Sequence, residues 1–274
     1  MWDKLQQLNA EVIVPLKHFG LKIKGPATDD SVLKGIIHRG GEWEPHVTRF
    51  IASVLKEGDR FIDVGANLGY YTLLGSRLVG KTGAVLAFEP FSINFNYLIE
   101  NLKLNNIDTD SNVTYYKYGL WNEETDKEVV FVTNHLGGTH ITSPDRPEYN
   151  IHQKETIHCI TFDSLNYPDS GTLKLIKIDI EGAEPFALMG MRRTIEKHRP
   201  IMVMELNRYW LRESFKVDSD VIWHQLKELG YEIYTFFEDK PITKKLTLDE
   251  LNRDCPANFL IDLIALPQES TGVV

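Results

Sequence analysis

One short acidic segment has the residue types and spacing that chemistry requires. Residues 177–181 read Lys-Ile-Asp-Ile-Glu, and the strand period of two places Lys177, Asp179 and Glu181 on the same side. Two carboxylates would then leave the carboxyl end of a central strand, where open α/β sheets bind their ligands. Glu205 stands at the corresponding end of the next predicted strand. We therefore expect three acidic groups to meet at one mouth of the sheet.

Three roles are open to these carboxylates. Asp179 or Glu205 could orient a substrate hydroxyl and take its proton. Asp179, Glu181 and Glu205 are also candidate ligands for a hard cation such as Mg²⁺, which would lower the pKa of that hydroxyl. Alternatively, the acids could cap the following helices and pair with Arg192 or Arg193, which would be a purely structural role.

A glycine-containing turn is the second feature with chemical meaning. Residues 63–70 read Asp-Val-Gly-Ala-Asn-Leu-Gly-Tyr and lie between a predicted strand and a predicted helix, where a doubly wound sheet binds nucleotide-like ligands. Dinucleotide sites have G-x-G-x-x-G, but here Asn67 stands at the second glycine position between Gly65 and Gly69. The departure weakens a pyrophosphate interpretation, and Asp63 suits a cation. S-adenosylmethionine has no phosphate and carries both an ammonium and a sulfonium group, so these residues favour it over a dinucleotide.

Glu89 is placed to bind a ribose. It follows the second predicted strand, directly before Pro90, and a carboxylate there can accept hydrogen bonds from both ribose hydroxyls. Because NAD also contains ribose, Glu89 alone does not separate the two cofactors. An NAD(P)-dependent oxidoreductase and a non-catalytic nucleotide-binding module are therefore the alternatives to a methyltransferase.

The elements that must position these residues alternate between strand and helix. Apolar residues spaced i, i+3, i+4 and i+7 predict helices that begin near residues 45, 70, 92, 183 and 220. The connection before the last strand is too short and polar to require a parallel crossover, so we expect that strand to be antiparallel. The fold class is thus α/β, Rossmann-like, with a mostly parallel sheet of seven strands, at residues 61–64, 84–88, 113–118, 173–179, 201–206, 231–237 and 259–266.

Two regions interrupt the alternation. Residues 1–43 form an N-terminal extension, helical or irregular, in which Trp2, Leu5, Leu8 and Val12 are loosely spaced for a helix; it is a possible substrate cap. The methyltransferase-like domain then spans residues 44–274. Residues 128–161 predict an inserted β-hairpin with a long polar tip.

The inserted hairpin concentrates side chains that could contact an acceptor. His140 is the catalytic candidate among its histidines, because histidine has a pKa suited to a general base. Aromatic rings could stack on a sugar face. The other histidines of the hairpin are His135, His152 and His158, and the aromatic residues considered are Tyr149 and Trp210.

Composition limits the partners. The net charge of −9 argues against nucleic acid, whose phosphates require Lys and Arg. No apolar run reaches the length of about 18 residues that a membrane span needs, so no membrane insertion is expected. Cys159 and Cys255 form no disulfide or metal-binding pattern, and no signal-peptide segment is recognisable; both observations favour a cytoplasmic location. The chain could be a complete protein or a domain of a larger cytoplasmic protein.

Together these segments resemble the FkbM family of methyltransferases. The similarity rests on residues 63–72, on Phe88-Glu89-Pro90 and on Leu175–Glu184 followed by Gly190, and it extends from about residue 40 to residue 207. The Asp-Ile-Glu-Gly-Ala-Glu segment at 179–184 is its most specific part.

The resemblance implies a class I fold and an S-adenosylmethionine-dependent O-methyltransferase. Its acceptors would be hydroxyls of sugars, glycans or secondary metabolites, with small-molecule N-methylation as the alternative and a larger glycan-modifying protein as the possible context. Asp179 would lie near the transferred methyl group, and Glu181 would help to keep the segment folded. The implied cofactor residues are Glu44, Asp63, Gly65, Ala66, Asn67, Gly69, Tyr71, Thr72, Glu89, Pro90 and Asp179.

Overall fold

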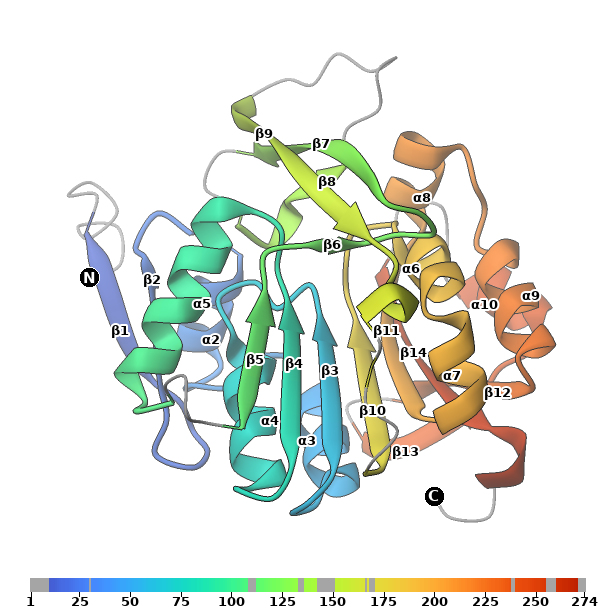
Figure 1. Cartoon of the computed structure of the whole chain (residues 1–274), viewed down its shortest axis with the longest axis horizontal. Helices are drawn as coiled ribbons and strands as arrows, with labels where there is room; N and C mark the ends of the chain where they lie inside the picture. Colours follow the sequence, from blue (N-terminus) through green and yellow to red (C-terminus); the bar gives the residue numbers. More distant parts are fainter. Residues whose placement is uncertain are drawn as a thin grey trace.

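A single large sheet organises the molecule. The computed structural model describes residues 10–29, 31–107, 112–132, 136–141, 151–165, 167, 171–237, 240–254 and 260–270. The eight strands of the sheet are β3 (Arg60–Val64), β4 (Ala84–Phe88), β5 (Val113–Tyr116), β10 (Leu173–Ile178), β11 (Ile201–Asn207), β12 (Tyr231–Phe237), β13 (Lys240–Lys245) and β14 (Leu260–Pro267). Their spatial order is β13-β12-β14-β11-β10-β3-β4-β5 (Figure 1).

The strand directions confirm the predicted α/β class. β5, β4, β3, β10 and β11 are mutually parallel, while β14 runs antiparallel to both β11 and β12. The predicted count of seven strands is wrong, because β13 adds an eighth at the edge, antiparallel to β12. The segment Lys-Pro-Ile-Thr-Lys-Lys lacks the apolar pattern of a central strand, but lysine and proline are typical of a sheet edge.

Helices cover both faces of the sheet. Successive strand residues point to opposite faces, so Phe61 joins one hydrophobic cluster and Ile62 the other, and Leu175 and Ile176 divide in the same way. The first cluster includes α3 (Pro45–Val54), α4 (Tyr70–Val79) and α5 (Ser92–Leu104), and the second includes α6 (Glu184–Gly190), α7 (Arg192–His198) and α9 (Asp220–Glu228). Two further helices, α8 (Arg208–Phe215) and α10 (Leu248–Asp254), follow β11 and β13.

The single helix expected over residues 183–197 is two helices. The chain turns at Met191, whose φ of −110° and ψ of 4° lie outside the α-helical region. Asp163, from the short 3-10 turn Phe162–Leu165, caps the start of α7: its carboxylate oxygens accept hydrogen bonds from the Arg193 and Thr194 amides at 2.8 and 3.0 Å. This cap lies 30 residues away in sequence, so the helical periodicity did not reveal it.

The N-terminal extension contains a β-hairpin followed by a short helix. β1 (Glu11–Pro15) pairs antiparallel with β2 (Lys22–Pro26), and α2 (Val32–His38) follows. Val12 therefore lies in a strand, which contradicts its predicted place in a helix; the β-branched run Val-Ile-Val favours the strand. Asn101 of α5 and Asn105, directly after that helix, each bind both backbone groups of a residue of β2: Asn101 binds Lys24, and Asn105 binds Lys22.

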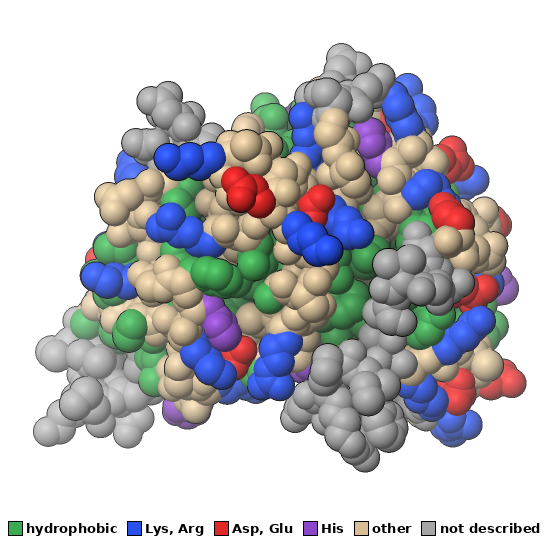
Figure 2. All heavy atoms as spheres, turned by 90° about the horizontal axis from the view of Figure 1, so that it is seen from below, with side chains coloured by type: hydrophobic (Ala, Val, Ile, Leu, Met, Phe, Trp, Pro, Cys, Tyr) green, Lys and Arg blue, Asp and Glu red, His purple; other side chains and the backbone are tan. Residues whose placement is uncertain are grey.

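The insertion forms a second, four-stranded sheet beyond the carboxyl ends of the central strands (Figure 1). Its strands are β6 (Gly119–Leu120), β7 (Thr125–Val132), β8 (His140–Ile141) and β9 (Ile151–Ile160), in the order β6-β9-β7-β8. The predicted hairpin corresponds to the antiparallel pair β7 and β9. The opposite face of the molecule shows Lys, Arg, Asp and Glu side chains dispersed among one another (Figure 2). Among the described residues, no helix has the length and hydropathy that crossing a membrane requires.

Substitution of Gly190 tests how tightly α6 packs against the backbone of Trp121, which directly follows β6 of this second sheet. A Cβ at Gly190 would lie 1.9 Å from the backbone carbonyl oxygen of Trp121. Helix propensity alone would make Gly190→Ala stabilising by about 1 kcal/mol. We expect instead a loss of about 2–3 kcal/mol in the free energy of unfolding, because the backbone must move. Urea denaturation measures this, and a gain in stability would contradict the packing described.

Candidate functional site

The turn after β3 brings the backbone of two strands into close contact. Gly65 has a φ of 82°, and a Cβ there would lie only 1.9 Å from the backbone oxygen of Asp179. The amides of Gly65 and Ala66 both donate to the carbonyl oxygen of Phe88 at 2.9 Å. Glycine is therefore required at position 65 by conformation and by space, and the turn lies directly beside the acidic segment.

Glu89 is bound to this turn through the backbone. Its Oε2 accepts a hydrogen bond from the Asn67 amide at 2.8 Å, and its Oε1 accepts one from the Phe91 amide at 2.9 Å. Asn67 has a φ of 51°, and its side-chain oxygen accepts from the Leu68 amide at 2.7 Å. Burial raises the pKa of Glu89 to about 7 despite these two donors. The carboxylate lines the cavity described below, with lone pairs left for further donors.

Three of the predicted cofactor residues lie behind the cavity wall. Asp63, Gly69 and Thr72 are not among the residues that line the cavity. Asp63 is fully buried, and its Oδ2 accepts a hydrogen bond from the Thr72 hydroxyl at 2.5 Å. Its Oδ1 has no hydrogen-bond partner among the described residues, and burial raises the pKa of the group. A Cβ at Gly69 would lie 2.6 Å from a methyl carbon of Leu98. These residues hold the turn in place.

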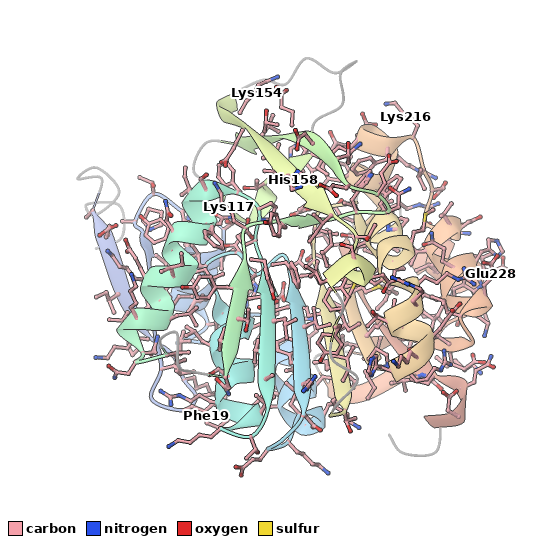
Figure 3. All side chains as sticks on the ribbon, in the orientation of Figure 1. Phe19, Lys117, Lys154, His158, Lys216 and Glu228 are labelled. Carbon is pink, nitrogen blue, oxygen red and sulfur yellow. The ribbon has the colours of Figure 1, made fainter. Side chains whose placement is uncertain are left out.

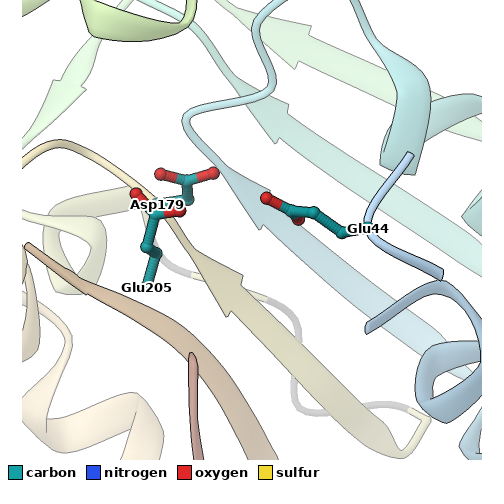
Figure 4. A group of neighbouring side chains, drawn as sticks. All are labelled: Glu44, Asp179 and Glu205. Atoms are coloured by element: carbon teal, nitrogen blue, oxygen red, sulfur yellow. The ribbon is translucent and has the colours of Figure 1, made fainter. Parts of the chain in front are cut away.

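Three carboxylates from separate elements converge at the carboxyl ends of β10 and β11. Glu44 precedes α3, Asp179 follows β10 and Glu205 belongs to β11. Each offers an oxygen such that the three atoms lie within 4.8 Å of one another. Figure 4 shows their side chains pointing toward one another. We call this group the carboxylate cluster.

Lys177 lies beside the carboxylate cluster. Its ammonium donates to Asp179 Oδ2 at 2.8 Å and lies 4.8 Å from the centre of the Tyr71 ring. The side chain is buried, and neighbouring carboxylates raise its pKa against the opposing effect of burial. Tyr71 in turn donates its hydroxyl to Glu44 Oε2 at 2.8 Å. Lys177 is thus the buried cation that offsets part of the negative charge of the cluster.

Burial and mutual repulsion favour protonation of two members of the cluster. Burial and then the nearby charge of Asp262 raise the pKa of Glu44 to about 7. Burial and then the charge of Asp179 raise the pKa of Glu205 well above its ordinary value. At neutral pH the cluster can therefore both accept and donate protons.

Glu181 lines the same cavity as the carboxylate cluster but is not a member of the cluster. β10 ends at Ile178, and Glu181 has a φ of 52°, so the strand period of two does not continue to it. Its Oε2 accepts a hydrogen bond from the Asn207 side chain at 2.6 Å. Of the predicted metal candidates the structure brings Asp179 and Glu205 together, with Glu44 as the third carboxylate. The sequence pattern did not indicate that Glu44, and not Glu181, would be the third carboxylate of the cluster.

The prediction that the acidic side chains could pair with Arg192 or Arg193 is wrong. Arg192 pairs with Glu196 at 2.8 Å, and Arg193 binds the backbone oxygen of Asp163 at 2.7 Å. Neither arginine is among the residues lining the cavity that the cluster occupies.

Among the histidines of the insertion whose side chains the structure describes, His140 reaches the cavity. It is buried, its Nδ1 lies 2.8 Å from the Gly138 carbonyl oxygen, and its ring stacks on Trp210 with the centroids 3.5 Å apart. Trp210 also contacts the acidic segment, because a Cβ on Gly182 would lie 3.0 Å from its side chain. His158 is exposed on β9 and pairs with Asp126 (Figure 3). His135, Tyr149 and the His152 side chain lie outside the described residues.

The Gly65 turn, Glu89, Lys177, the carboxylate cluster and His140 face one cavity of about 510 Å³. Its floor contains the Gly65 turn, Glu89, Pro90 and the carboxylate cluster. Its other walls come from the N-terminal extension and the insertion, which meet where the Ser31 hydroxyl accepts a hydrogen bond from the Gly137 amide at 2.9 Å. Several lining residues were not predicted as site residues from the sequence, among them Lys34, Arg39, Trp43, Tyr118 and Cys159.

Glu184 provides a test of the electrostatics behind the site. Its Oε1 accepts from the Ile180 and Gly182 amides at 3.1 Å, its Oε2 is buried with no hydrogen-bond partner among the described residues, and burial raises its pKa to about 7. A raised folded-state pKa stabilises the fold below about pH 4.5, and that contribution is lost as the pH rises to about 7. Glu184→Gln should therefore reduce the loss of unfolding free energy across this window by about 3 kcal/mol.

Urea denaturation at several pH values between 4.5 and 8 measures this effect. The matched substitution Glu228→Gln changes an exposed side chain of α9 (Figure 3) and should leave the pH profile unaltered. Identical profiles for wild type and Glu184→Gln would show that the burial of Glu184 does not govern its proton affinity.

Comparison with known proteins identifies the family. The model of the methyltransferase FkbM domain matches residues 63–233. A search of curated protein sequences finds no match. A solved FkbM methyltransferase from Methylobacillus flagellatus KT is 17% identical, with a TM-score of 0.46, and the match covers 96% of this chain. The chain thus spans 57% of the length of that protein.

Two other solved structures are similar to this chain. The human methyltransferase 10 domain containing protein is 13% identical over 97% of this chain and 96% of its own, with a TM-score of 0.47. A SAM-dependent O-methyltransferase from Thermotoga maritima is 16% identical over 93% and 77%, with a TM-score of 0.41. The family model covers more than half of the chain, includes both the Gly65 turn and the Asp179 segment, and shows that this protein belongs to the FkbM methyltransferase family.

Proposed function

We propose that this protein transfers a methyl group from S-adenosylmethionine to a hydroxyl group of a sugar, glycan or secondary metabolite. The observation that carries the proposal is the convergence of Glu44, Asp179 and Glu205 in a cavity whose floor is the Gly65 turn. Family membership supports methyl transfer. The hydroxyl acceptor rests on the site, because a carboxylate beside a hydroxyl can orient it and accept its proton.

The residues present fit the cofactor. The Gly65 turn offers a backbone surface with no side chain at that position, and Glu89 offers oxygen lone pairs to ribose hydroxyls. The acidic surroundings suit a ligand that carries an ammonium and a sulfonium group, and they disfavour a pyrophosphate. Ala66, Asn67, Pro90, Tyr71 and Glu44 complete this side of the cavity. When bound, S-adenosylmethionine supplies an electrophilic methyl group.

Within this proposal Asp179 is the group that binds and deprotonates the acceptor hydroxyl. The Lys177 ammonium fixes Asp179 Oδ2, which leaves Oδ1 to face a hydroxyl. Glu205, whose pKa is raised, can hold a proton and donate a hydrogen bond beside it. Placement of the oxygen in line with the methyl group would supply most of the acceleration.

His140 is the second candidate base. In the neutral ring, the contact between its Nδ1 and the Gly138 oxygen assigns the proton to Nδ1, so that Nε2 is the nitrogen able to take a proton. The stack on Trp210 fixes the plane of the ring.

A divalent cation is an alternative role for the carboxylate cluster. Three carboxylates within 4.8 Å present the oxygen ligands that Mg²⁺ prefers. Such an ion would lower the pKa of a bound hydroxyl. The same oxygens would then be ligands, and EDTA treatment separates the two roles.

The proposed setting is a reducing compartment such as the cytoplasm, with the chain acting alone or within a larger glycan-modifying protein. Cys159 is a buried free thiol in the wall of the cavity, and a reduced thiol is compatible with such a compartment.

Asp179→Asn tests the role of the proposed base. The substitution keeps the shape of the side chain but removes its proton affinity, so kcat should fall by about 100-fold or more. The dissociation constant for S-adenosylhomocysteine should change by less than about threefold, a shift under 1 kcal/mol. Labelled S-adenosylmethionine with a panel of sugars and hydroxylated small molecules, with and without EDTA, measures turnover; calorimetry measures binding. Turnover equal to that of the wild type would overturn the assignment, and EDTA-sensitive turnover would assign the cluster to a metal.

Glu89→Ala should give the opposite pattern. Loss of the ribose acceptor should weaken S-adenosylhomocysteine binding by about tenfold, equivalent to about 1.4 kcal/mol. At saturating cofactor, kcat should change little. Glu228→Ala, on exposed α9, is the control with the same change of charge. Unaltered cofactor affinity in Glu89→Ala would remove Glu89 from the binding site.

A further inference from the structure

One face of α2 forms a cationic rim on the cavity. The cavity-lining positions of this region are 31, 32, 34, 35, 38 and 39, and the helical period places all of them on one side of the helix. Three of these positions carry Lys34, His38 and Arg39. Lys34 is half-buried, whereas His38 and Arg39 are exposed. The floor of the same cavity is acidic, so the two ends of the cavity differ in charge.

The guanidinium of Arg39 is held in place by its surroundings. Its Cζ lies 5.6 Å from the centre of the Trp43 ring, and its Nη1 lies 3.5 Å from the Gly35 carbonyl oxygen. Trp43 packs so closely on the helix that a Cβ at Gly35 would lie 2.3 Å from its ring. Glycine within a helix costs about 1 kcal/mol relative to alanine. Gly35 therefore lowers the intrinsic stability of α2 but leaves room for the Trp43 ring, over which Arg39 lies.

Within the described part of the chain, no carboxylate forms an ion pair with Arg39 or His38. Glu42, the nearest acid in sequence on this side, pairs with Lys17 and His18, both at 3.0 Å. The planar guanidinium is suited to binding a carboxylate or phosphate through two parallel hydrogen bonds.

We propose that the acceptor carries an anionic group, a carboxylate, phosphate or sulfate, which Arg39 binds at the rim while the hydroxyl to be methylated reaches the carboxylate cluster. This inference rests on the proposed function and narrows its substrate class to acidic sugars and similar molecules. Trp43 would offer its ring to the apolar face of such a sugar.

The cofactor has a carboxylate of its own, and this is the second possible source of the anion. The difference in burial favours the acceptor. Glu89 and the turn at Ala66, where the cofactor is expected, are buried, whereas His38 and Arg39 are exposed at the rim. An acceptor that enters from solvent after the cofactor has bound would contact the exposed rim before it reaches the buried part of the cavity.

The test is calorimetric titration of protein loaded with S-adenosylhomocysteine. Glucuronate, glucose 6-phosphate and glucose are the three probes. The two anionic sugars should bind at least about tenfold more tightly than glucose, the gain of one charge-assisted hydrogen-bonded pair. Arg39→Ala should remove this preference, Arg39→Lys should retain part of it, and Arg49→Ala should leave it intact. Arg49 is an exposed arginine of α3 outside the cavity, so it matches the change of charge.

Equal affinity for the three sugars, or no measurable binding of any of them, would overturn the proposal. A loss of about tenfold in S-adenosylhomocysteine affinity in Arg39→Ala would assign the arginine to the cofactor carboxylate and would also overturn it. Both results leave the proposed function standing. Failure of the wild-type protein to bind S-adenosylhomocysteine would instead contradict the proposed function itself.

Discussion

The close approach of the Gly65 backbone to the Asp179 carbonyl is the constraint on which the site depends. The oxygen of Asp179 occupies the space that a Cβ at position 65 would need, and the Asp179 amide donates to the Val64 carbonyl oxygen at 3.0 Å. Two neighbouring parallel strands are thereby joined just past their carboxyl ends. The turn proposed to bind the cofactor and the acid proposed to bind the acceptor are therefore held together by direct backbone contacts.

This arrangement brings several carboxylates, and hence negative charge, together in a partly buried region of one cavity. Glu44, Glu89 and Glu205 all have raised pKa values for the same principal reason, burial. Lys177 offsets part of that charge, and its contact with Asp179 keeps one carboxylate oriented. A ligand that brings positive charge into this cavity lowers the electrostatic cost of the ionised carboxylates. The acidic lining of the cavity therefore favours a ligand that carries positive charge.

Local patterns were sufficient to predict seven of the eight strands of the large sheet and the Gly65 turn, because each of these elements depends on residues close in sequence. They failed where distant residues decide the outcome. Glu44 reaches Asp179 across more than a hundred residues from a left-handed position with a φ of 38°, and no periodicity encodes that contact. Asp163 divides a predicted helix in two from outside it. The in-phase position of Glu181 was misleading because the strand had already ended.

Calorimetric titration of the wild-type protein with S-adenosylhomocysteine and, in parallel, with NADH tests the central claim most directly. We expect one molecule of S-adenosylhomocysteine to bind per chain and NADH not to bind. The reasons are that the turn has Asn67 where a dinucleotide site has its second glycine, and that the floor of the cavity is acidic. Binding of NADH without binding of S-adenosylhomocysteine would contradict it.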